Sequence, residues 1–415
     1  MRRLLPFLIP FITVLTVEGE RPFNGNASYH LSNGMNGMVS LNADGYFGSD
    51  AITNRLASDY LRHRFITDEH KSDVDAKMSG YNRFGTWFDG SIDVAIRIDS
   101  SDLAFISTIQ HHLYYDCLFS DDLFSLYFRG NKPFAGERAY VGRSSFQSML
   151  YYQFGAGVSG TAASGKLTWH ALGSLYLGHD LLDINSDGDG YLYTAPDGSY
   201  IDADVNLRFV RSDSLNTSPL SVNGTGAGIS FGGTYDFGKG WKGTLAAANI
   251  GFITFNGKTA DASIDTSFRF EGIEAQQLFD FKDSVRVFEN DSSYIASFFK
   301  SRTQAKHTRL VPGHADFSIS KELSGGRWIL AGGLQWLFSQ NATPIFWSTA
   351  THPMGSHSLG IWLREGGYSG FNAGLEYGFQ SFGWRVSIGS DVLSSWIDTR
   401  YGSAMGAFVS LSKSF

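Results

Sequence analysis

The sequence has one cysteine, few prolines and no long apolar run. Because Cys117 is the single cysteine among 415 residues, the chain can form neither an intrachain disulfide nor a site built from several cysteines. No window of about 18 apolar residues occurs, so helical membrane spans are not expected. Lysine and arginine form no cluster, and the net charge is -7, which excludes a basic surface for nucleic acid.

The composition is rich in glycine, with 48 residues, and in aromatic residues, at 15%. Charged residues make up 18%, below the roughly 25% that is usual for soluble domains. The mean hydropathy of -0.13 is too low for a helical membrane protein but suits a barrel whose wall is half polar. Composition therefore favours a β-barrel.

The last hundred residues alternate between apolar and polar side chains. In residues 371–380 every second residue from Phe371 to Phe379 is apolar, and those between are small or polar. Alternation of this kind indicates strands with one apolar face. In a transmembrane barrel that face turns outward to lipid. Large aromatic residues are expected on this face as interfacial girdles: Trp328, Trp336, Phe338, Trp347, Trp362, Trp384 and Trp396.

The strand segments number twelve to sixteen, and we predict an all-β fold, a transmembrane antiparallel barrel of about 14 strands, with 12 or 16 as alternatives. The chain closes on a strand ending in Phe415, which is similar to the assembly signal of outer-membrane barrels. A barrel of this size has a lumen that wall side chains alone do not fill, so a plug is expected.

Three regions precede or interrupt the barrel, which is assigned to residues 81–415. Residues 1–18 have a basic start and an apolar run, which predicts a secretory signal peptide and export to the outer membrane of a Gram-negative bacterium. Residues 19–80 are expected to lie in the lumen as a plug, or else to form a periplasmic tail. Residues 271–302 have apolar residues at helical spacing, which predicts a helical insertion at the barrel mouth or in the lumen.

Two shorter helices are also expected. Ile52, Leu56 and Tyr60 are at helical spacing. Ser120 precedes two aspartates, and Gly130 follows about one helix length later, which predicts a capped short helix between them.

One acidic segment has the spacing of a calcium loop. Oxygen-bearing side chains alternate at Asp183, Asn185, Asp187 and Asp189, with a glycine at the sixth position. Calcium takes six to eight hard oxygen ligands, and the glycine permits the sharp turn. The twelfth position is Thr194 and not the glutamate of an EF-hand. The segment predicts either a calcium-binding extracellular loop or a solvated acidic turn.

Several segments are rich in glycine and aromatic residues, and they lie at 128–136, 152–157, 226–235, 249–255 and 270–273. These segments resemble those of an uncharacterised family of Bacteroidota outer-membrane proteins. This family is similar in architecture to the long-chain fatty-acid transporter barrels and to the barrel of the type IX secretion system. The resemblance implies an exported barrel of fourteen strands with an N-terminal lumen segment. It carries over no functional residues.

These observations predict a non-catalytic barrel, in contact with outer-membrane lipid and monomeric, that passes or binds a small hydrophobic ligand. The ligand would enter at the extracellular mouth, pass the N-terminal segment and leave laterally or to the periplasm. One alternative is a structural or secretion-accessory barrel that binds protein partners. A second is an outer-membrane lipid hydrolase, although no Gly-x-Ser-x-Gly elbow or carboxylate pair stands out. No cofactor is expected apart from calcium.

Overall fold

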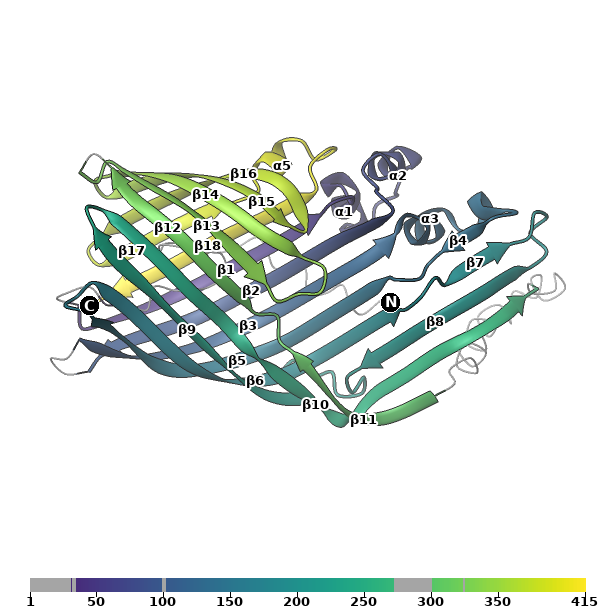
Figure 1. The fold of residues 1–415 in the computed structure, drawn as a ribbon, viewed down its shortest axis with the longest axis horizontal. Coiled ribbons are helices and arrows are strands. Elements are labelled where there is room, and N and C mark those ends of the chain that lie inside the picture. Colours follow the sequence, from purple (N-terminus) through teal and green to yellow (C-terminus); the bar gives the residue numbers. More distant parts are fainter. Residues whose placement is uncertain (1–30, 32–34, 99–101, 272–300, 324) are drawn as a thin grey trace.

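The computed structural model describes residues 31, 35–98, 102–271, 301–323 and 325–415. Its described residues form one sheet of 18 antiparallel strands that closes on itself, because β1 (Gly37–Ser49) pairs with both β2 (Tyr81–Arg97) and β18 (Ala404–Ser414). Four of the 18 strands lie in an extension, and the remaining fourteen form the wall of the barrel (Figure 1). The predicted antiparallel barrel of 14 strands is confirmed.

The other wall strands follow in chain order, each paired with its neighbours around the ring. They are β3 (Leu103–Ser120), β5 (Ser145–Ala162), β6 (Leu167–Ser186), β9 (Gly224–Gly238), β10 (Trp241–Phe270), β12 (His314–Leu323), β13 (Trp328–Leu337), β14 (Thr343–Met354), β15 (His357–Gly367), β16 (Ser369–Ser381) and β17 (Trp384–Ser390).

One side of the barrel is taller than the other. The strand β10 has 30 residues, and its second half runs beyond the barrel into an extension with four further strands. There β8 pairs with β6 and β10 beyond the point where β9 begins. The extension strands are β4 (Arg138–Tyr140), β7 (Tyr191–Thr194), β8 (Ile201–Arg211) and β11 (Ser301–Leu310).

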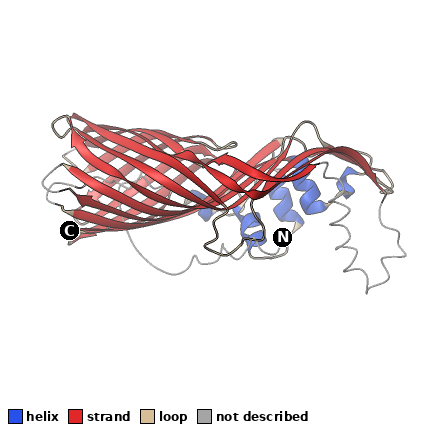
Figure 2. Cartoon of the chain, turned by 90° about the horizontal axis from the view of Figure 1, so that it is seen from below, coloured by secondary structure: helices blue, strands red, loops and turns tan. Residues whose placement is uncertain are grey.

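The two ends of the barrel differ. At the turn end, near the C-terminus, consecutive strands are joined by short connections such as residues 239–240, 355–356 and 382–383. The loop end carries the extension and the helices, which gather away from the C-terminus (Figure 2). These are α1 (Asn54–Leu61), α2 (Asp68–Asp75), α3 (Asp121–Arg129), the 3-10 helix η2 (Lys132–Phe134) and α5 (Ser394–Ile397).

The assignment of residues 19–80 to a lumen plug is wrong for part of that range. Residues 37–49 form the wall strand β1, because hydrogen bonding to β2 and β18 satisfies its backbone on both edges. The helices α1 and α2 belong to the connection between β1 and β2 at the loop end. The predicted signal peptide, residues 1–18, and residues 272–300 of the predicted helical insertion lie outside the described residues, while residues 301–302 begin β11.

The short helices form where the sequence predicts them. The Ser120 hydroxyl accepts a hydrogen bond from the backbone N–H of Leu123 at 3.0 Å and so caps α3. Gly130 ends that helix with a φ of 74°, a conformation that glycine adopts without steric cost. Nowhere in the described parts of the chain is a helix long and apolar enough to cross a membrane.

The outer face of the wall is apolar, as the alternation predicts. Trp328, Trp336 and Trp384 are exposed on it at 43%, 57% and 46%. Trp347 and Trp362, also expected there, instead face the lumen and pack together with ring centroids 5.6 Å apart. The alternation of side chains along each strand decides this. Phe346 and Ile361, next to the two tryptophans, point outward, so the tryptophans point inward.

Candidate functional site: the closed lumen

Polar side chains line the lumen toward the turn end. The Asn42 amide on β1 donates to Ser91 at 3.1 Å and to Asp93 at 2.9 Å, both on β2. Thr108 on β3 donates to the other oxygen of Asp93 at 2.5 Å. These residues face inward in adjacent strands, so the lumen here has a hydrogen-bonded polar lining.

A second polar chain centres on His112 of β3. Its Nδ1 lies 2.7 Å from the Asp89 carboxylate and its Nε2 lies 3.0 Å from the Gln153 amide oxygen. Gln153 in turn donates to Ser174 on β6 at 2.9 Å. Both nitrogens of this buried histidine therefore have partners within the wall.

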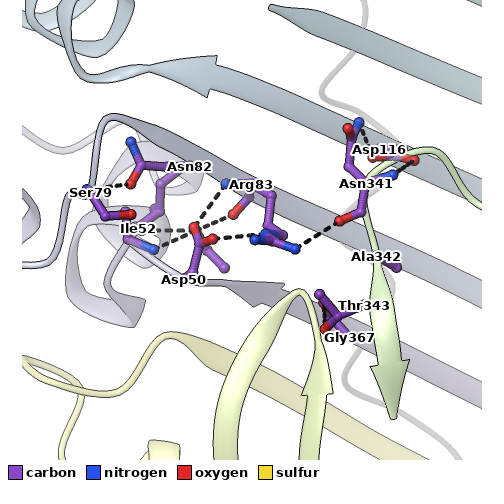
Figure 3. A network of polar contacts seen from close by, with 12 residues as sticks. Asp50, Ile52, Ser79, Asn82, Arg83, Asp116, Asn341, Ala342, Thr343 and Gly367 are labelled. Atoms are coloured by element: carbon purple, nitrogen blue, oxygen red, sulfur yellow. Dashed lines mark hydrogen bonds and ion pairs between the residues drawn. The ribbon is translucent and has the colours of Figure 1, made fainter.

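Near the loop end, a turn folds into the barrel and reaches the opposite wall. We call residues 339–342, between β13 and β14, the inward turn. The Asp116 carboxylate on β3 accepts hydrogen bonds from the backbone N–H of Gln340 at 3.0 Å and from the side-chain amide of Asn341 at 2.7 Å (Figure 3). Tyr114 donates to the same carboxylate at 3.1 Å. Strands on opposite sides of the ring are thus tied together across the lumen.

An arginine on β2 also holds the inward turn in place. Arg83 on β2 donates through its side chain to the Asp50 carboxylate at 2.9 Å and to the backbone oxygen of Asn341 at 3.3 Å (Figure 3). The Asn341 amide also donates to Ser145 on β5 at 3.1 Å. The turn therefore contacts β2, β3 and β5 at once.

Aromatic rings fill the lumen next to the inward turn. Tyr368, between β15 and β16, shares a hydroxyl hydrogen bond of 2.7 Å with Tyr114 across the barrel. Its ring lies over Gly85, where an added Cβ would come within 2.1 Å of it. Tyr46 and Trp87 stack in the same layer with centroids 4.1 Å apart. All four aromatic side chains are buried, so this layer closes the lumen.

A buried ion pair completes the closure. The Arg364 side chain on β15 has no exposed area, forms an ion pair with Asp391 and lies over the Tyr46 ring, its guanidinium carbon 4.8 Å from the centroid. A buried charge without a partner costs several kcal/mol, so this arginine depends on its carboxylate. Inward charged residues at such depth are functional candidates.

The helices cover this closure from outside. The Asn54 side chain in α1 donates to the backbone oxygens of Ser395 and Ala404, each at 2.7 Å. Arg400 pairs with Asp73 of α2 at 2.9 Å, and the hydrogen bond that the guanidinium donates to Asp73 raises the pKa of Arg400. The first connection and the last one are thereby joined over the loop end.

An apolar patch lies on the lumen wall at the taller side. In this patch the ring of Tyr176 lies over Gly228 and Gly251, where an added Cβ would come within 2.5 Å and 2.7 Å of the tyrosine. These glycines make room for the ring. We call the buried set the lumen apolar cluster: Met149, Tyr151, Tyr176, Leu181, Val210, Ile253, Phe255 and Val311.

The wall changes partners beside this cluster. The strand β10 pairs with β12 as far as Ala248 and with β11 from Phe252 onward. Between them Asn249 has a φ of 57°, and the β9 register shifts there, which marks a bulge. Gly313, between β11 and β12, lies so close that an added Cβ would be 2.6 Å from the Ala248 oxygen. The wall is therefore bent at this point.

An apolar groove of about 410 Å³ lies on the outer face of the same strands. Phe231, Leu245 and Phe317 line it, and all three are exposed. The groove lies on the outer side of the wall and not on the lumen side.

The structure spreads the four residues of the predicted calcium loop along a strand and its turn. Asp183 and Asn185 are in β6, where the Asn185 amide donates to Asp183 at 2.6 Å. Asp183 also forms an ion pair with Arg309, and Asp189 pairs with Arg143 at 2.7 Å. Asp187 lies in the following turn. Two of the three carboxylates are thus engaged by arginines. Calcium binding stays a prediction, and calcium titration of the purified protein would test it.

Sequence reasoning did not single out Asp116, Asn341, Arg364 or Asp391. A signal was present for Arg364, because it occupies an inward position between the outward Leu363 and an outward glutamate. The inward turn has no such signal. Its contacts with the opposite wall join residues 196 to 258 positions apart in the chain.

Comparison with known proteins adds a family. No curated protein matches this chain. Solved structures similar to it include the Pseudomonas putida toluene transporter TodX, at 10% identity over 95% of both chains with a TM-score of 0.43. A Pseudomonas aeruginosa FadL homologue has 8% identity over 92% of this chain and 90% of its own, also with a TM-score of 0.43. At these scores the likenesses carry no argument about function. A family model described as "Family of unknown function (DUF5723)" matches residues 26–391, and the chain therefore belongs to the DUF5723 family.

Proposed function

We propose that this protein is a non-catalytic outer-membrane barrel that binds a small hydrophobic ligand in its lumen and passes it through the wall or the lumen. The observation that carries the proposal is the lumen apolar cluster. It places tyrosine, phenylalanine and aliphatic side chains on the inner face of the barrel, beside the closure and beside the bend in the wall. A barrel that passed only water and ions would have no use for such a patch.

The outward apolar face supports the membrane location. Leucine, isoleucine and aromatic side chains occupy outward positions in neighbouring strands, for example Leu359, Ile361 and Leu375, each more than 40% exposed. Barrels of the outer membrane carry short turns on the periplasmic side and longer loops outside. The loop end of this protein, with its helices and extension, therefore faces the cell exterior.

The contacts that close the lumen define the order of steps by which a ligand would pass through the barrel. A ligand arrives at the loop end, where the extension offers a wall taller than the rest of the barrel. It reaches the lumen apolar cluster when the inward turn releases Asp116. From there it leaves through the bend between β10, β11 and β12 or continues to the turn end. In this proposal the conformation described above is the closed state of the cycle.

Ligand binding can be tested directly on protein purified in detergent. We expect long-chain fatty acid or toluene, used as probes, to bind, and Leu181→Gln to weaken binding because it puts an amide into the lumen apolar cluster. Leu172→Gln is the matched control, since Leu172 is a buried inward leucine of the same strand that packs with Ile106 instead. Equal loss in both variants, or no binding of either probe to the unmodified chain, would contradict the proposal.

The second candidate is a structural or secretion-accessory barrel that binds protein partners. The polar lining and the buried Arg364 and Asp391 pair favour it, because they fill the lumen with groups that hold each other. If the accessory role is correct, variants that release the inward turn will leave probe uptake into liposomes unchanged, and partner proteins will copurify through the loop end.

A further inference from the structure

The outward face of the wall stops being apolar where the extension begins. Trp241 and Phe252 of β10 are both exposed on this face, and the bulge at Asn249 keeps them on the same side. They lie eleven positions apart, and a tilted strand needs about 9–11 residues to cross a membrane. The apolar band therefore ends at Phe252 and at its exposed cross-strand partner Leu310 on β11. Residues of the extension just beyond these two lie at the level of the lipid headgroups.

Two basic side chains occupy this level on the outward face. Lys306 is exposed, and strand alternation places it on the same side of β11 as Leu310, four positions away. Arg211 on β8 also faces outward, because its neighbour Val210 points into the lumen apolar cluster. Both cations therefore stand on the membrane side of the wall and not in the lumen.

The sheet brings the two cations close together. The strands β8, β10 and β11 run side by side in the extension, where Ala260 of β10 pairs with Arg211 on one edge and with Gln304 on the other (Figure 1). Adjacent strands are about 4.8 Å apart and residues rise about 3.4 Å along a strand, so Arg211 and Lys306 are about 12 Å apart at Cα. Two long side chains can contact one headgroup across this gap.

The charge of this set is not balanced within the described part of the chain. The Arg211 Nε is buried without a hydrogen bond. A third cation, Lys258, lies at the irregularity in β10 and has the Asp213 carboxylate 3.5 Å away. Three cations and one carboxylate leave two positive charges on the outward face. An arginine that is partly buried is normally matched by an anion, so the set is open to an anion from outside the chain.

The neighbouring surface is apolar, which indicates that this anion belongs to a lipid. The connection between β8 and β9 lies against the outer face, where its Pro219 carbonyl accepts a hydrogen bond from Tyr152 of β5 at 2.9 Å. Leu215 and Leu220 of the same connection are 93% and 82% exposed. Acyl chains beneath a headgroup would cover these leucines, whereas a small anion in solution would leave them in water.

We propose that Arg211 and Lys306 form an outward-facing site for the phosphate group of an outer-leaflet lipid, with Lys258 beside them. A guanidinium binds phosphate through two parallel N–H groups, and an ammonium acts as a point charge. The site rests on the outer-membrane location in the proposed function and not on the passage of a ligand, because none of its residues faces the lumen. A failure of ligand passage would therefore leave this site untouched.

The test measures lipid binding to the full chain in detergent by native mass spectrometry, with lipid A as the phosphorylated probe. We expect the double variant Arg211→Gln, Lys306→Gln to bind it about 30-fold more weakly, since each cation near an anionic lipid surface contributes about a factor of five. Arg211→Lys keeps the charge and should retain most of the affinity. The matched control is Lys321→Gln, which removes an outward lysine beside Trp241 at the turn end and should bind as the unmodified chain does.

Competition with millimolar inorganic phosphate separates a lipid site from a site for the free anion. We expect lipid A to stay bound, because free phosphate lacks the part that covers the leucines. Complete displacement of the lipid would overturn the proposal in favour of a site for free phosphate. Equal binding by the unmodified chain and the double variant, or an equal loss in Lys321→Gln, would also overturn it. Heat-modifiable gel migration checks that each variant is folded, and the single variants serve if the double variant does not fold.

Discussion

The inward turn predicts that one asparagine controls how often the lumen opens. In Asn341→Ala the Asp116 carboxylate loses the amide donor at 2.7 Å, and Ser145 loses its donor at 3.1 Å. A hydrogen bond to a charged group contributes about 1.5–3 kcal/mol and a neutral one about 0.5–1.5 kcal/mol. The backbone N–H of Gln340 still binds Asp116, so we take the lower sum, about 2 kcal/mol.

A change of about 2 kcal/mol shifts the equilibrium between closed and open states roughly 30-fold. A barrel that is open for about one part in a thousand of the time would then be open for a few per cent. Conductance across a planar lipid bilayer measures this fraction directly. We expect frequent openings in Asn341→Ala and rare ones in the unmodified chain.

The control for this experiment is Asn256→Ala. The Asn256 side chain accepts a hydrogen bond from the backbone N–H of Lys258 at the irregularity within β10 and is not among the contacts that cross the lumen. It should leave the openings unchanged. The reasoning is refuted if Asn341→Ala, folded by its gel migration, conducts no more than this control.

Three further outcomes follow from the closure and the wall. Arg364→Met should lower stability by about 3–5 kcal/mol, because it leaves Asp391 buried without its cation, and adding Asp391→Leu should restore much of the loss; urea unfolding in lipid measures both. Gly228→Val should lower folding yield or stability because its Cβ meets a tyrosine ring at 2.6 Å, whereas Gly173→Val, with nothing within 4 Å, should not. Hydrogen bonding between two tyrosines raises the pKa of Tyr127 in α3 to about 12 from an ordinary ~10. A raised pKa contributes stability that is complete below pH ~10 and is lost as the pH rises toward the folded value, so the late part of the tyrosinate absorbance titration should lose the contribution of one tyrosine in Tyr127→Phe.

The strand pattern could be predicted from the sequence because strand geometry is local. Alternation along β13, β15 and β16 assigns each residue to one face whatever its neighbours do, and the outward leucines and tryptophans follow it. The cap and stop signals at Ser120 and Gly130 were equally local and placed α3 correctly. The count of fourteen strands rested on the same pattern.

The alternation also shows where local reasoning fails. Trp347 and Trp362 were expected in the lipid-facing girdle because tryptophan is common there, yet their positions in the alternation place them inside. Residues 37–49 were assigned to the N-terminal lumen segment because their alternation is weak, and only pairing with β2 and β18 makes them a wall strand. In the first case the residue type predicted the wrong face of the strand, and in the second the weak periodicity concealed a strand.

The sequence by itself determined that this protein is a barrel with an apolar outside, because both statements depend on which residues are two apart. Only the tertiary structure decided that the lumen is closed. The inward turn meets Asp116, Tyr368 meets Tyr114, and Arg364 meets Asp391 through contacts that depend on the curvature and closure of the whole wall. No local pattern encodes which side chains face each other across a lumen, since that is fixed only when the last strand pairs with the first.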